Sequence, residues 1–288
     1  RIPEGSRQSR GRHIANIVEL REDEEITAIV PVRNFEKGFL FMATKNGTVK
    51  KTQMSLFANP RKGGIRAIGL DEDDLLVGVR YTPGDQEIIL ATRYGLANRF
   101  KESDIRPIGR SARGVRGIRL GYKDEVIGML AADNSKQILT VTKKGYAKRT
   151  NVDEYRLCNR GGKGVINIKI TEKNGEVAHI MVVDGTEELM LISHNGIAIR
   201  MECSSISHIG RSTQGVRAMR LDESDYVVAA AKIASEDVDD ATIENEEESV
   251  VEKSEKSSTN EVNKNEEDVM VKKEENEEDI TPSIEPNV

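Results

Sequence analysis

Aromatic residues are scarce in this sequence. Tryptophan is absent, and aromatic residues make up only 4% of the 288 residues. Proteins that bind single-stranded nucleic acid usually stack bases on aromatic side chains, and readers of the major groove usually insert a helix. The sequence has no helical periodicity and no aromatic residues interleaved with its cations. These absences argue against a protein that reads bases.

Cysteines are few, and long apolar runs and an initial methionine are missing. Cys158 and Cys203 form no CxxC pair, so no disulfide framework is expected. No apolar run approaches the roughly 18 residues of a membrane span, and no signal peptide is present. We therefore expect a cytoplasmic protein without a membrane partner. The start at Arg1 rather than methionine predicts a fragment of a longer protein.

Catalytic and cofactor-binding patterns are missing as well. His13, His179, His194 and His208 have no cysteine or carboxylate at metal-ligand spacing, so no metal site is expected. Residues 161–164 form a glycine-rich basic segment, but they lack the spacing and the Ser/Thr of a Walker-type phosphate loop. We therefore expect this chain to have no catalytic residue and no cofactor of its own.

The clearest positive pattern is an internal repeat. Four β-rich runs each end in a glycine turn that is followed by a second short run, which is typical of a β-hairpin. The turn glycines are Gly47, Gly95, Gly145 and Gly196, at intervals of 48, 50 and 51 residues. A regular interval of this size indicates one structural unit repeated along the chain.

A second landmark follows each hairpin about a dozen residues later. It is an Arg-x-x-x-Gly segment, here called an arginine loop, and most of its copies are followed by an alternating apolar strand such as Ile118 and Leu120. An acidic turn and a last apolar strand complete the unit. The copies are Arg7 to Gly11, Arg110 to Gly114, Arg160 to Gly164 and Arg211 to Gly215, with a shifted copy at 60–64.

These landmarks predict an all-β fold of four-stranded repeats arranged like the blades of a propeller, a β-pinwheel. Each repeat is too small to bury a core alone and must stack on its neighbours. A pair of unrelated β-sandwiches is the alternative, which the matching spacing of two independent landmarks disfavours. The expected domain is 1–233, with a partial first blade at 1–32 and repeats at about 37–82, 87–132, 137–183 and 188–233.

Charge is distributed unevenly along the chain. Residues 235–288 contain 20 acidic and five basic residues, which leaves 38 basic and 29 acidic residues in 1–234. The segment 234–288 has few large apolar residues, so we predict a disordered acidic tail. The basic body predicts a polyanionic partner, and the tail is expected to compete for the same basic surface.

Equivalent loops of stacked repeats should align along one rim. The cations expected to contact the polyanion there belong to the arginine loops and to the ends of the hairpins. They are Arg7, Arg10, Arg12, Lys50, Lys51, Arg61, Lys62, Arg66, Arg99, Lys101, Arg110, Arg113, Arg116, Lys148, Arg149, Arg160, Lys163, Arg200, Arg211 and Arg217.

A periodic basic rim is suited to double-stranded DNA held by its phosphates, without a sequence code. A duplex that follows a convex rim must bend, which costs of order 1–6 kcal/mol for a bend of 40–90° over 20–30 base pairs. The alternative is that these cations form a solvated surface paired with the acidic turns. Unrelated surface charges, however, have no reason to recur every 50 residues.

The repeats resemble the C-terminal domain of the A subunit of bacterial DNA gyrase. The resemblance rests on residues 113–120 (RGVRGIRL), 214–221 (QGVRAMRL) and 29–32 (IVPV), and it covers about 1–233. The family's diagnostic box reads Gln-Arg-Arg-Gly-Gly-Lys-Gly and lies in the first blade. Residues 160–164 match its last five positions, but Cys158 and Asn159 replace Gln-Arg, and the match lies in a later repeat. The principal box is therefore expected before Arg1.

The resemblance implies blades that exchange strands and a rim that wraps DNA. It implies that this part is not itself an enzyme. The parent protein would be an ATP-hydrolysing type II topoisomerase whose catalytic tyrosine and ATPase lie outside this chain. The implied partners are DNA, the rest of the gyrase A subunit and the gyrase B subunit in a heterotetramer, and the implied location is the nucleoid. Two alternatives remain, the equivalent domain in the A subunit of topoisomerase IV and a propeller-type protein-interaction scaffold.

Overall fold

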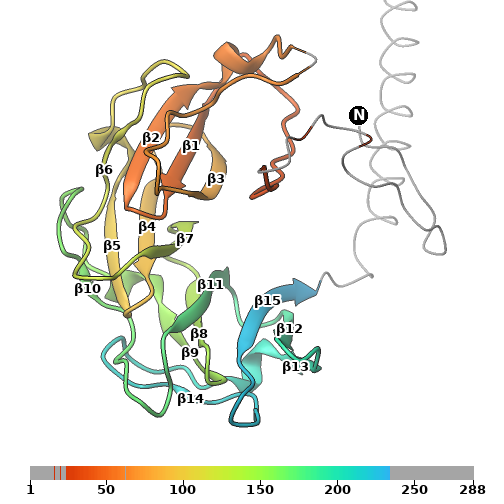
Figure 1. The fold of residues 1–288 in the computed structure, drawn as a ribbon. Coiled ribbons are helices and arrows are strands. Elements are labelled where there is room, and N and C mark those ends of the chain that lie inside the picture. Colours follow the sequence, from red (N-terminus) through yellow and green to blue (C-terminus); the bar gives the residue numbers. More distant parts are fainter. Residues whose placement is uncertain (1–15, 17–19, 21–23, 62, 234–288) are drawn as a thin grey trace, which may run out of the picture. The chain divides into compact units, whose positions relative to one another are not determined.

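The computed structural model describes residues 16, 20, 24–61 and 63–233. The chain divides into two units, Arg1–Ala234 and Ser235–Val288. The predicted disorder of the acidic tail and the partial blade at 1–32 fall largely or entirely outside the described residues. The four complete repeats lie in the first unit and are drawn in Figure 1.

Each repeat contributes a hairpin and a third long strand to one sheet. The first repeat contains β1 (Phe39–Thr44), β2 (Thr48–Gln53) and β3 (Leu76–Thr82), and the second contains β4 (Glu87–Thr92), β5 (Leu96–Lys101) and β7 (Val126–Ala131). The third contains β8 (Gln137–Thr142), β9 (Tyr146–Asn151) and β11 (Val177–Val183), and the fourth β12 (Glu188–Ser193), β13 (Ala198–Glu202) and β15 (Val227–Ile233).

A short 3-10 helix follows the second strand of every hairpin. These helices are η2 (Met54–Phe57), η3 (Glu102–Asp104), η4 (Val152–Glu154) and η5 (Cys203–Ser205). The arginine loop comes next, and in three repeats it ends in a two-residue strand. These strands are β6 (Val115–Arg116), β10 (Val165–Ile166) and β14 (Val216–Arg217).

The two-residue strands cross to the preceding sheet. β6 of the second repeat pairs with β2, β10 of the third pairs with β5, and β14 of the fourth pairs with β9. The first sheet therefore has the order β3-β1-β2-β6, and the next two have the same plan. Among the described residues, the fourth sheet has three strands, β13-β12-β15. The predicted all-β pinwheel with exchanged strands is confirmed.

Gly95 shows why the hairpin turns need glycine. Its φ is +81°, and a Cβ at this position would lie 2.4 Å from the carbonyl oxygen of Ile168, which belongs to the next repeat. The Gly95 carbonyl in turn accepts a hydrogen bond from the Asn167 amide (2.8 Å). The turn is thus shaped to receive the chain that follows the exchanged strand, and an alanine there would be both strained and obstructed.

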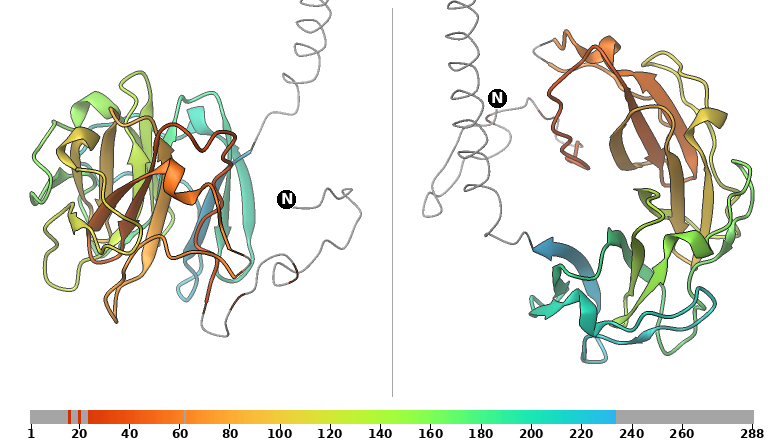
Figure 2. Two further views of the ribbon diagram at one scale, coloured as in Figure 1. Left: turned by 90° about the horizontal axis from the view of Figure 1, so that it is seen from above. Right: turned by 180° about the vertical axis from the view of Figure 1, so that it is seen from behind.

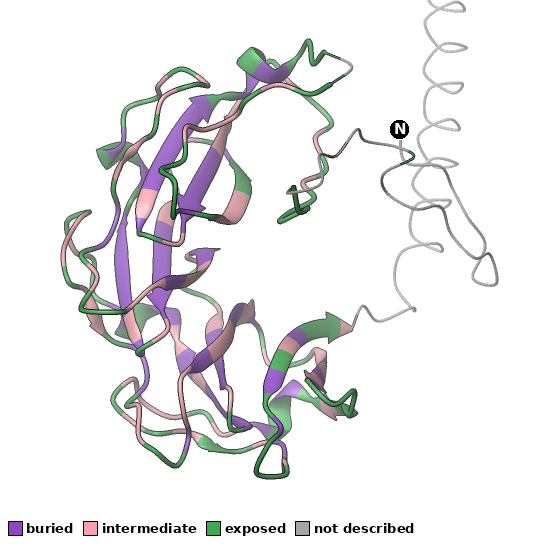
Figure 3. Cartoon of the chain, viewed as in Figure 1, coloured by how far each residue is buried: buried purple, intermediate pink, exposed green. Residues whose placement is uncertain are grey.

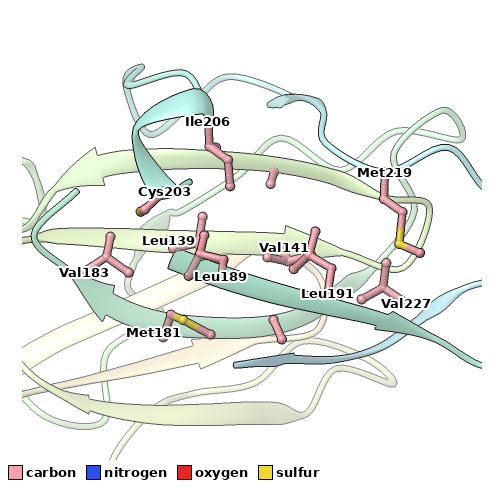
Figure 4. Close-up of a cluster of buried hydrophobic side chains, with 12 residues drawn as sticks. Leu139, Val141, Met181, Val183, Leu189, Leu191, Cys203, Ile206, Met219 and Val227 are labelled. Atoms are coloured by element: carbon pink, nitrogen blue, oxygen red, sulfur yellow. The ribbon is translucent and has the colours of Figure 1, made fainter. Parts of the chain in front are cut away.

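Apolar clusters fill the three junctions between consecutive sheets of the described residues. At the last junction, Leu139 of β8 and Val183 of β11 pack with Leu189 and Leu191 of β12, and Met219 closes the cluster (Figure 4). The third long strand of each repeat contacts the third long strand of the next, in the order β3, β7, β11 and β15. Figures 1 and 2 show the four sheets side by side in that order. Stacking on neighbours therefore supplies the core that a single repeat lacks.

Ion pairs also connect consecutive repeats. Glu125 accepts from Lys45 of the preceding repeat (3.3 Å) and pairs with Arg93. Glu176 lies 3.7 Å from Arg93 and 2.8 Å from Lys143. Acidic residues next to the predicted turns therefore do pair with cations. The partners of Glu125 and Glu176 lie in the hairpin turns and are none of the cations expected to contact DNA. Asp71, at the acidic turn of the first repeat, does pair with one of those cations, Arg113 (2.6 Å).

Candidate nucleic-acid interface

The arginine loops lie along the edge of each sheet that carries the exchanged strand. In the second, third and fourth repeats, the segment that leads into the arginine loop is anchored to the second hairpin strand of the preceding repeat by a backbone hydrogen bond. The amides of Ile108, Cys158 and Ile209 donate to the carbonyls of the residues four positions after the hairpin glycines, over 2.9, 2.7 and 2.9 Å. The loops of successive repeats consequently occupy equivalent places on successive sheets, as the sequence spacing predicts. We call this edge the rim.

Most of the predicted cations on the rim are accessible. The side chain of Arg113 is 74% exposed, and its ion pair with Asp71 (2.6 Å) also lies at the surface. Arg110 and Arg211 are half-buried. Figure 3 shows the exposed loops outside the buried strands. The other exposed residues of the predicted set are Arg61, Arg66, Lys101, Arg116, Arg160, Lys163, Arg200 and Arg217.

Two depressions of the same construction lie between neighbouring arginine loops. Each combines the glycine that ends one loop with the Arg-Ser pair of the next loop. One has a volume of about 380 Å³ and is lined by Arg61, Gly64, Ile65, Arg66, Arg110 and Ser111. The other, of about 600 Å³, is lined by Leu96, Arg156, Lys163, Gly164, Val165, Ile166, Arg211 and Ser212. Both gather three cations, which is a composition suited to phosphate groups.

The leading arginine of two loops bonds to the exchanged strand of the preceding repeat. The Arg211 Nη1 donates to the Ile166 carbonyl (2.8 Å), and the Arg160 Nη1 donates to the Arg116 carbonyl (3.5 Å). The Arg160 Nε also donates to the Asp104 carbonyl (3.2 Å). These contacts place a guanidinium at the boundary between two loops, so that positive charge bridges consecutive repeats.

Direct DNA contact was expected of the cations at the hairpin ends, and for four of them this expectation is wrong. Lys50 and Lys148 are fully buried, and Lys51 and Arg99 are 4% and 7% exposed. The physical reason is strand exchange. The second hairpin strand looks like a sheet edge in the sequence, but the following repeat covers it with its arginine loop and exchanged strand.

These buried cations bind backbone carbonyls of the following repeat. Arg99 donates through Nη1 to the carbonyls of Val152 (2.9 Å) and Tyr155 (3.1 Å), next to η4. Lys51 donates to the Glu102 carbonyl (3.1 Å) in η3. Arg149, which is half-buried, donates through Nε to the Ile206 carbonyl (2.8 Å) after η5. Their charges therefore join repeats to each other, and burial leaves the buried members without the exposed surface that the predicted contact with DNA requires.

The buried lysines titrate abnormally, which predicts a dependence of stability on pH. Burial is the main cause that lowers the pKa of Lys50 and of Lys148 to about 8; Arg110 and Arg211 respectively contribute to this lowering, and Glu154 opposes it at Lys148. The unfolded chain, with an ordinary lysine pKa of 10.5, binds more protons than the folded chain above about pH 8. The free energy of unfolding should therefore rise with pH between about 8 and 10.5.

We expect this effect to appear when wild type is compared with Lys148→Met. The stability of wild type relative to the variant should increase by at most about 1.4 kcal/mol for each pH unit above 8. Thermal denaturation of both proteins at pH 7.5, 8.5 and 9.5 measures it. The comparison removes the titration of other groups, such as Tyr155, whose pKa burial raises. A difference in melting temperature that stays constant over this range would show that the amine is solvated.

Several exposed cations of the rim were not predicted. Arg106 and Arg156 lie four residues before two arginine loops, and Arg119, Lys169 and Arg220 follow the exchanged strands. The last three stand between two apolar residues in each repeat. Period-two alternation was therefore a usable signal, because it directs the residue between two inward-facing positions outward.

Four of the predicted DNA contacts, Arg7, Arg10, Arg12 and Lys62, lie outside the described residues. In the part of the chain that the structure describes, no group of three or more His, Cys, Asp or Glu side chains is arranged to hold a metal ion. No helix of that part has the length and apolar character needed to cross a bilayer.

Comparisons with known proteins agree with this architecture. The sequence profile described as "DNA gyrase C-terminal domain, beta-propeller" matches residues 1–33, 38–83, 86–133, 136–184 and 187–234. The DNA gyrase A subunit of Halalkalibacterium halodurans is 52% identical over 257 residues, which are 89% of this chain and 30% of the relative. The same subunit of Clostridium acetobutylicum is 44% identical over 261 residues, which are 90% of this chain and 31% of the relative.

Solved structures show the same fold. The C-terminal domain of DNA topoisomerase IV superposes with a TM-score of 0.74 at 28% identity, covering 79% of this chain and 72% of that one. A DNA gyrase A C-terminal domain superposes with a TM-score of 0.69 at 24% identity, covering 79% and 76%. The chain spans about 30% of the length of the curated relatives above. The chain belongs to the DNA gyrase C-terminal domain family.

Proposed function

We propose that this chain binds double-stranded DNA along its rim without sequence preference and bends the duplex around consecutive repeats. The observation that carries the proposal is the recurrence of one cationic depression at equivalent junctions, each shared by the arginine loops of two repeats. A ligand that crosses both depressions must be a long polyanion with regularly spaced charges. The relatives are DNA gyrase subunits, whose name agrees with such a ligand.

The energetics of this proposal are favourable if several phosphates are contacted. A bend of 40–90° over 20–30 base pairs costs of order 1–6 kcal/mol, and a hydrogen bond to a charged group contributes about 1.5–3 kcal/mol. Four or more arginine–phosphate contacts therefore offset the bend. Binding through six or more phosphates should lose about 10³-fold or more in affinity between 50 and 200 mM salt.

Within the parent protein, we propose that wrapping supports ATP-dependent negative supercoiling by a gyrase made of A and B subunits in the bacterial cytoplasm. The chemistry would take place outside this chain. The equivalent role in topoisomerase IV is the second candidate, favoured by the superposition on that enzyme's C-terminal domain. The residues that precede Arg1 in the parent protein discriminate between the two, because an intact diagnostic box there supports gyrase. Binding of residues 235–288 to the rim stays a prediction.

Ligation of a nicked plasmid tests the proposal directly. The chain is added at saturating concentration in low salt, the nick is sealed with ligase, and the topoisomers are resolved after protein removal. Wrapping should shift the mean linking number, and the shift should grow with protein until the DNA is saturated. An unchanged linking number would reject wrapping. Binding of a protein partner with little dependence on salt, together with no affinity for DNA, would support the scaffold alternative.

A further inference from the structure

The third residue after each hairpin glycine occupies an unusual environment. In the first three repeats it is Lys50, Asn98 and Lys148, and each of these polar side chains is 0% exposed. Burying a charged or amide group in a protein interior is unfavourable unless it is hydrogen-bonded. A leucine or methionine would fill comparable space without this penalty. The polar groups must therefore make contacts that an apolar side chain cannot make.

Those contacts reach the arginine loop of the following repeat. The Lys148 Nζ donates to the carbonyls of Gly210 (2.9 Å) and Arg211 (2.7 Å). The Asn98 Nδ2 donates to the Asn159 carbonyl (3.3 Å), immediately before Arg160. Lys50 donates to the carbonyl of Arg110. In all three cases the acceptor is the arginine that leads the loop or the residue before it.

Two of these side chains also hold the far end of a loop. The Lys50 Nζ donates to the Ala67 carbonyl (2.6 Å), and the Asn98 Nδ2 donates to the Gly117 carbonyl (2.9 Å). Ala67 and Gly117 are equivalent positions, three residues after the glycine that ends the loop. The fourth repeat has Ile199 at the position that corresponds to Lys50, and its side chain has no hydrogen-bond donor.

The affected loops carry the cations of the two depressions. The Arg211 backbone is held by Lys148, and its guanidinium bonds to the Ile166 carbonyl (2.8 Å), so that both ends of this residue are fixed by the preceding repeat. Without the donor, the carbonyls of Gly210 and Arg211 lose a bond in a partly buried setting. An unsatisfied carbonyl favours a loop that turns toward water, which would displace the arginine.

We propose that Lys50, Asn98 and Lys148 are positioning residues that fix the arginine loop of the following repeat in its DNA-binding conformation. Each acts through the loop backbone and does not touch DNA. One buried side chain of each of these repeats then fixes the position of the next arginine loop along the rim. The consequence for DNA rests on the proposed function, whereas the effect on the loop itself does not.

Lys148→Met tests the proposal because methionine keeps the length of the side chain and removes the donor. Lys148→Asn supplies the amide that Asn98 uses at the equivalent position. Lys232→Met removes one positive charge from β15, away from the rim, and serves as the control for net charge. Amide hydrogen exchange over 209–215 is measured without DNA. Affinity for a 40-base-pair duplex is measured by fluorescence anisotropy at 50 mM salt.

Lys148→Met should raise the exchange rates over 209–215 about tenfold or more and leave those of β8 unchanged. Its affinity for the duplex should fall about fivefold. Lys148→Asn should recover at least part of both losses, and Lys232→Met should leave the loop exchange unchanged. Wild-type exchange over 209–215 in Lys148→Met would overturn the proposal whatever happens to DNA binding. If Lys148→Met raises the exchange rates of the loop but the wild-type chain does not bind DNA, Lys148 does position the loop. The proposed function would then be rejected.

Asn98→Leu provides a second test if Lys148→Met does not fold. It removes a donor without changing charge, and it should raise exchange over 157–164, where the amides of Cys158 and Gly161 are hydrogen-bonded at 2.7 Å each. Unchanged exchange there, or global unfolding of both variants, would overturn the proposal. Global unfolding would assign these side chains to the stability of the sheets.

Discussion

Replacing Arg110, Arg113 and Arg116 together by glutamate is expected to reduce the affinity for duplex DNA by about 100-fold or more at 100 mM salt. The three arginines belong to one arginine loop and its exchanged strand. Arg110 lines the first depression, and Arg113 and Arg116 are exposed further along the same loop and its exchanged strand. Loss of two charge-assisted contacts to phosphate, at about 1.5–3 kcal/mol each, accounts for a factor of this size.

The fold should survive this change. Arg113 loses an ion pair with Asp71 in which both side chains are more than half exposed, and such pairs contribute about 0–1 kcal/mol. The melting temperature should therefore change by a few degrees at most. Fluorescence anisotropy with several duplex sequences measures the affinity, which should fall uniformly and with a shallower dependence on salt. A loss confined to one sequence would indicate base readout instead.

A control variant of the same charge separates rim contact from general electrostatics. Lys37→Glu, Lys136→Glu and Lys232→Glu together change the charge equally. Lys37 and Lys136 closely precede β1 and β8, and Lys232 lies in β15. None of them lies on the edge that carries the exchanged strands. This control should retain most of the wild-type affinity. Equal losses in the two triple variants would show that net charge, rather than the rim, determines binding.

The repeat, its four strands and its apolar alternation could all be predicted from the sequence. Turn glycines such as Gly95 and Gly145 indicate hairpins because few other residues adopt a positive φ. Ile118 and Ile168 likewise show by their spacing that they face a core. These signals are local, since each depends on the backbone conformation or the burial of its own segment.

The partner of each short strand could not be predicted in the same way. β6 pairs with β2 rather than with a strand of its own repeat, and the alternation of its residues is the same in either case. That one long-range pairing decides whether the hairpin end is a surface or an interior. It explains why Arg116 was correctly expected to be exposed while Lys50 and Arg99 were not recognised as buried.

Charge alone was also an incomplete guide to the candidate site. A lysine in a short polar strand is usually solvated, so nothing in the sequence around Lys148 marks it as buried. Its two acceptors, the carbonyls of Gly210 and Arg211, lie 62 and 63 residues away along the chain, at distances of 2.9 and 2.7 Å. By contrast, Arg119 and Lys169 follow the same alternation as the core residues beside them. These two residues could therefore have been included among the predicted DNA-binding cations from the sequence alone.

Gly164→Ala is expected to destabilise the fold strongly. Gly164 has a φ of +77°, and a Cβ would lie 2.2 Å from the carbonyl oxygen and 2.7 Å from the carbonyl carbon of Ala97 in β5. Both obstructing atoms belong to the backbone of a central strand, so they cannot rotate away. Relief requires β10 to separate from β5, with loss of the pairing of Val165 with Ala97 and of Ile166 with Leu96.

We expect the free energy of unfolding to fall by about 3 kcal/mol, of which about 1–2 kcal/mol reflects the left-handed backbone and the rest the lost contacts. This corresponds to a decrease in melting temperature of about 6–12 °C for a protein of this size. DNA affinity should fall as well, because Lys163 and Arg160 move with the strand. Thermal denaturation and anisotropy measure the two effects.

Gly64→Ala is the matched control because Gly64 occupies the equivalent position of the first repeat. It has the same φ of +77°, yet a Cβ there would meet no atom within 4 Å. Only the conformational term should remain, so the loss should be about 1–2 kcal/mol. The difference in unfolding free energy between the two variants measures how much the close packing of β10 against β5 contributes. Equal losses would mean that β10 tolerates a side chain at this point, and that strand exchange does not determine how the arginine loop is placed on the preceding sheet.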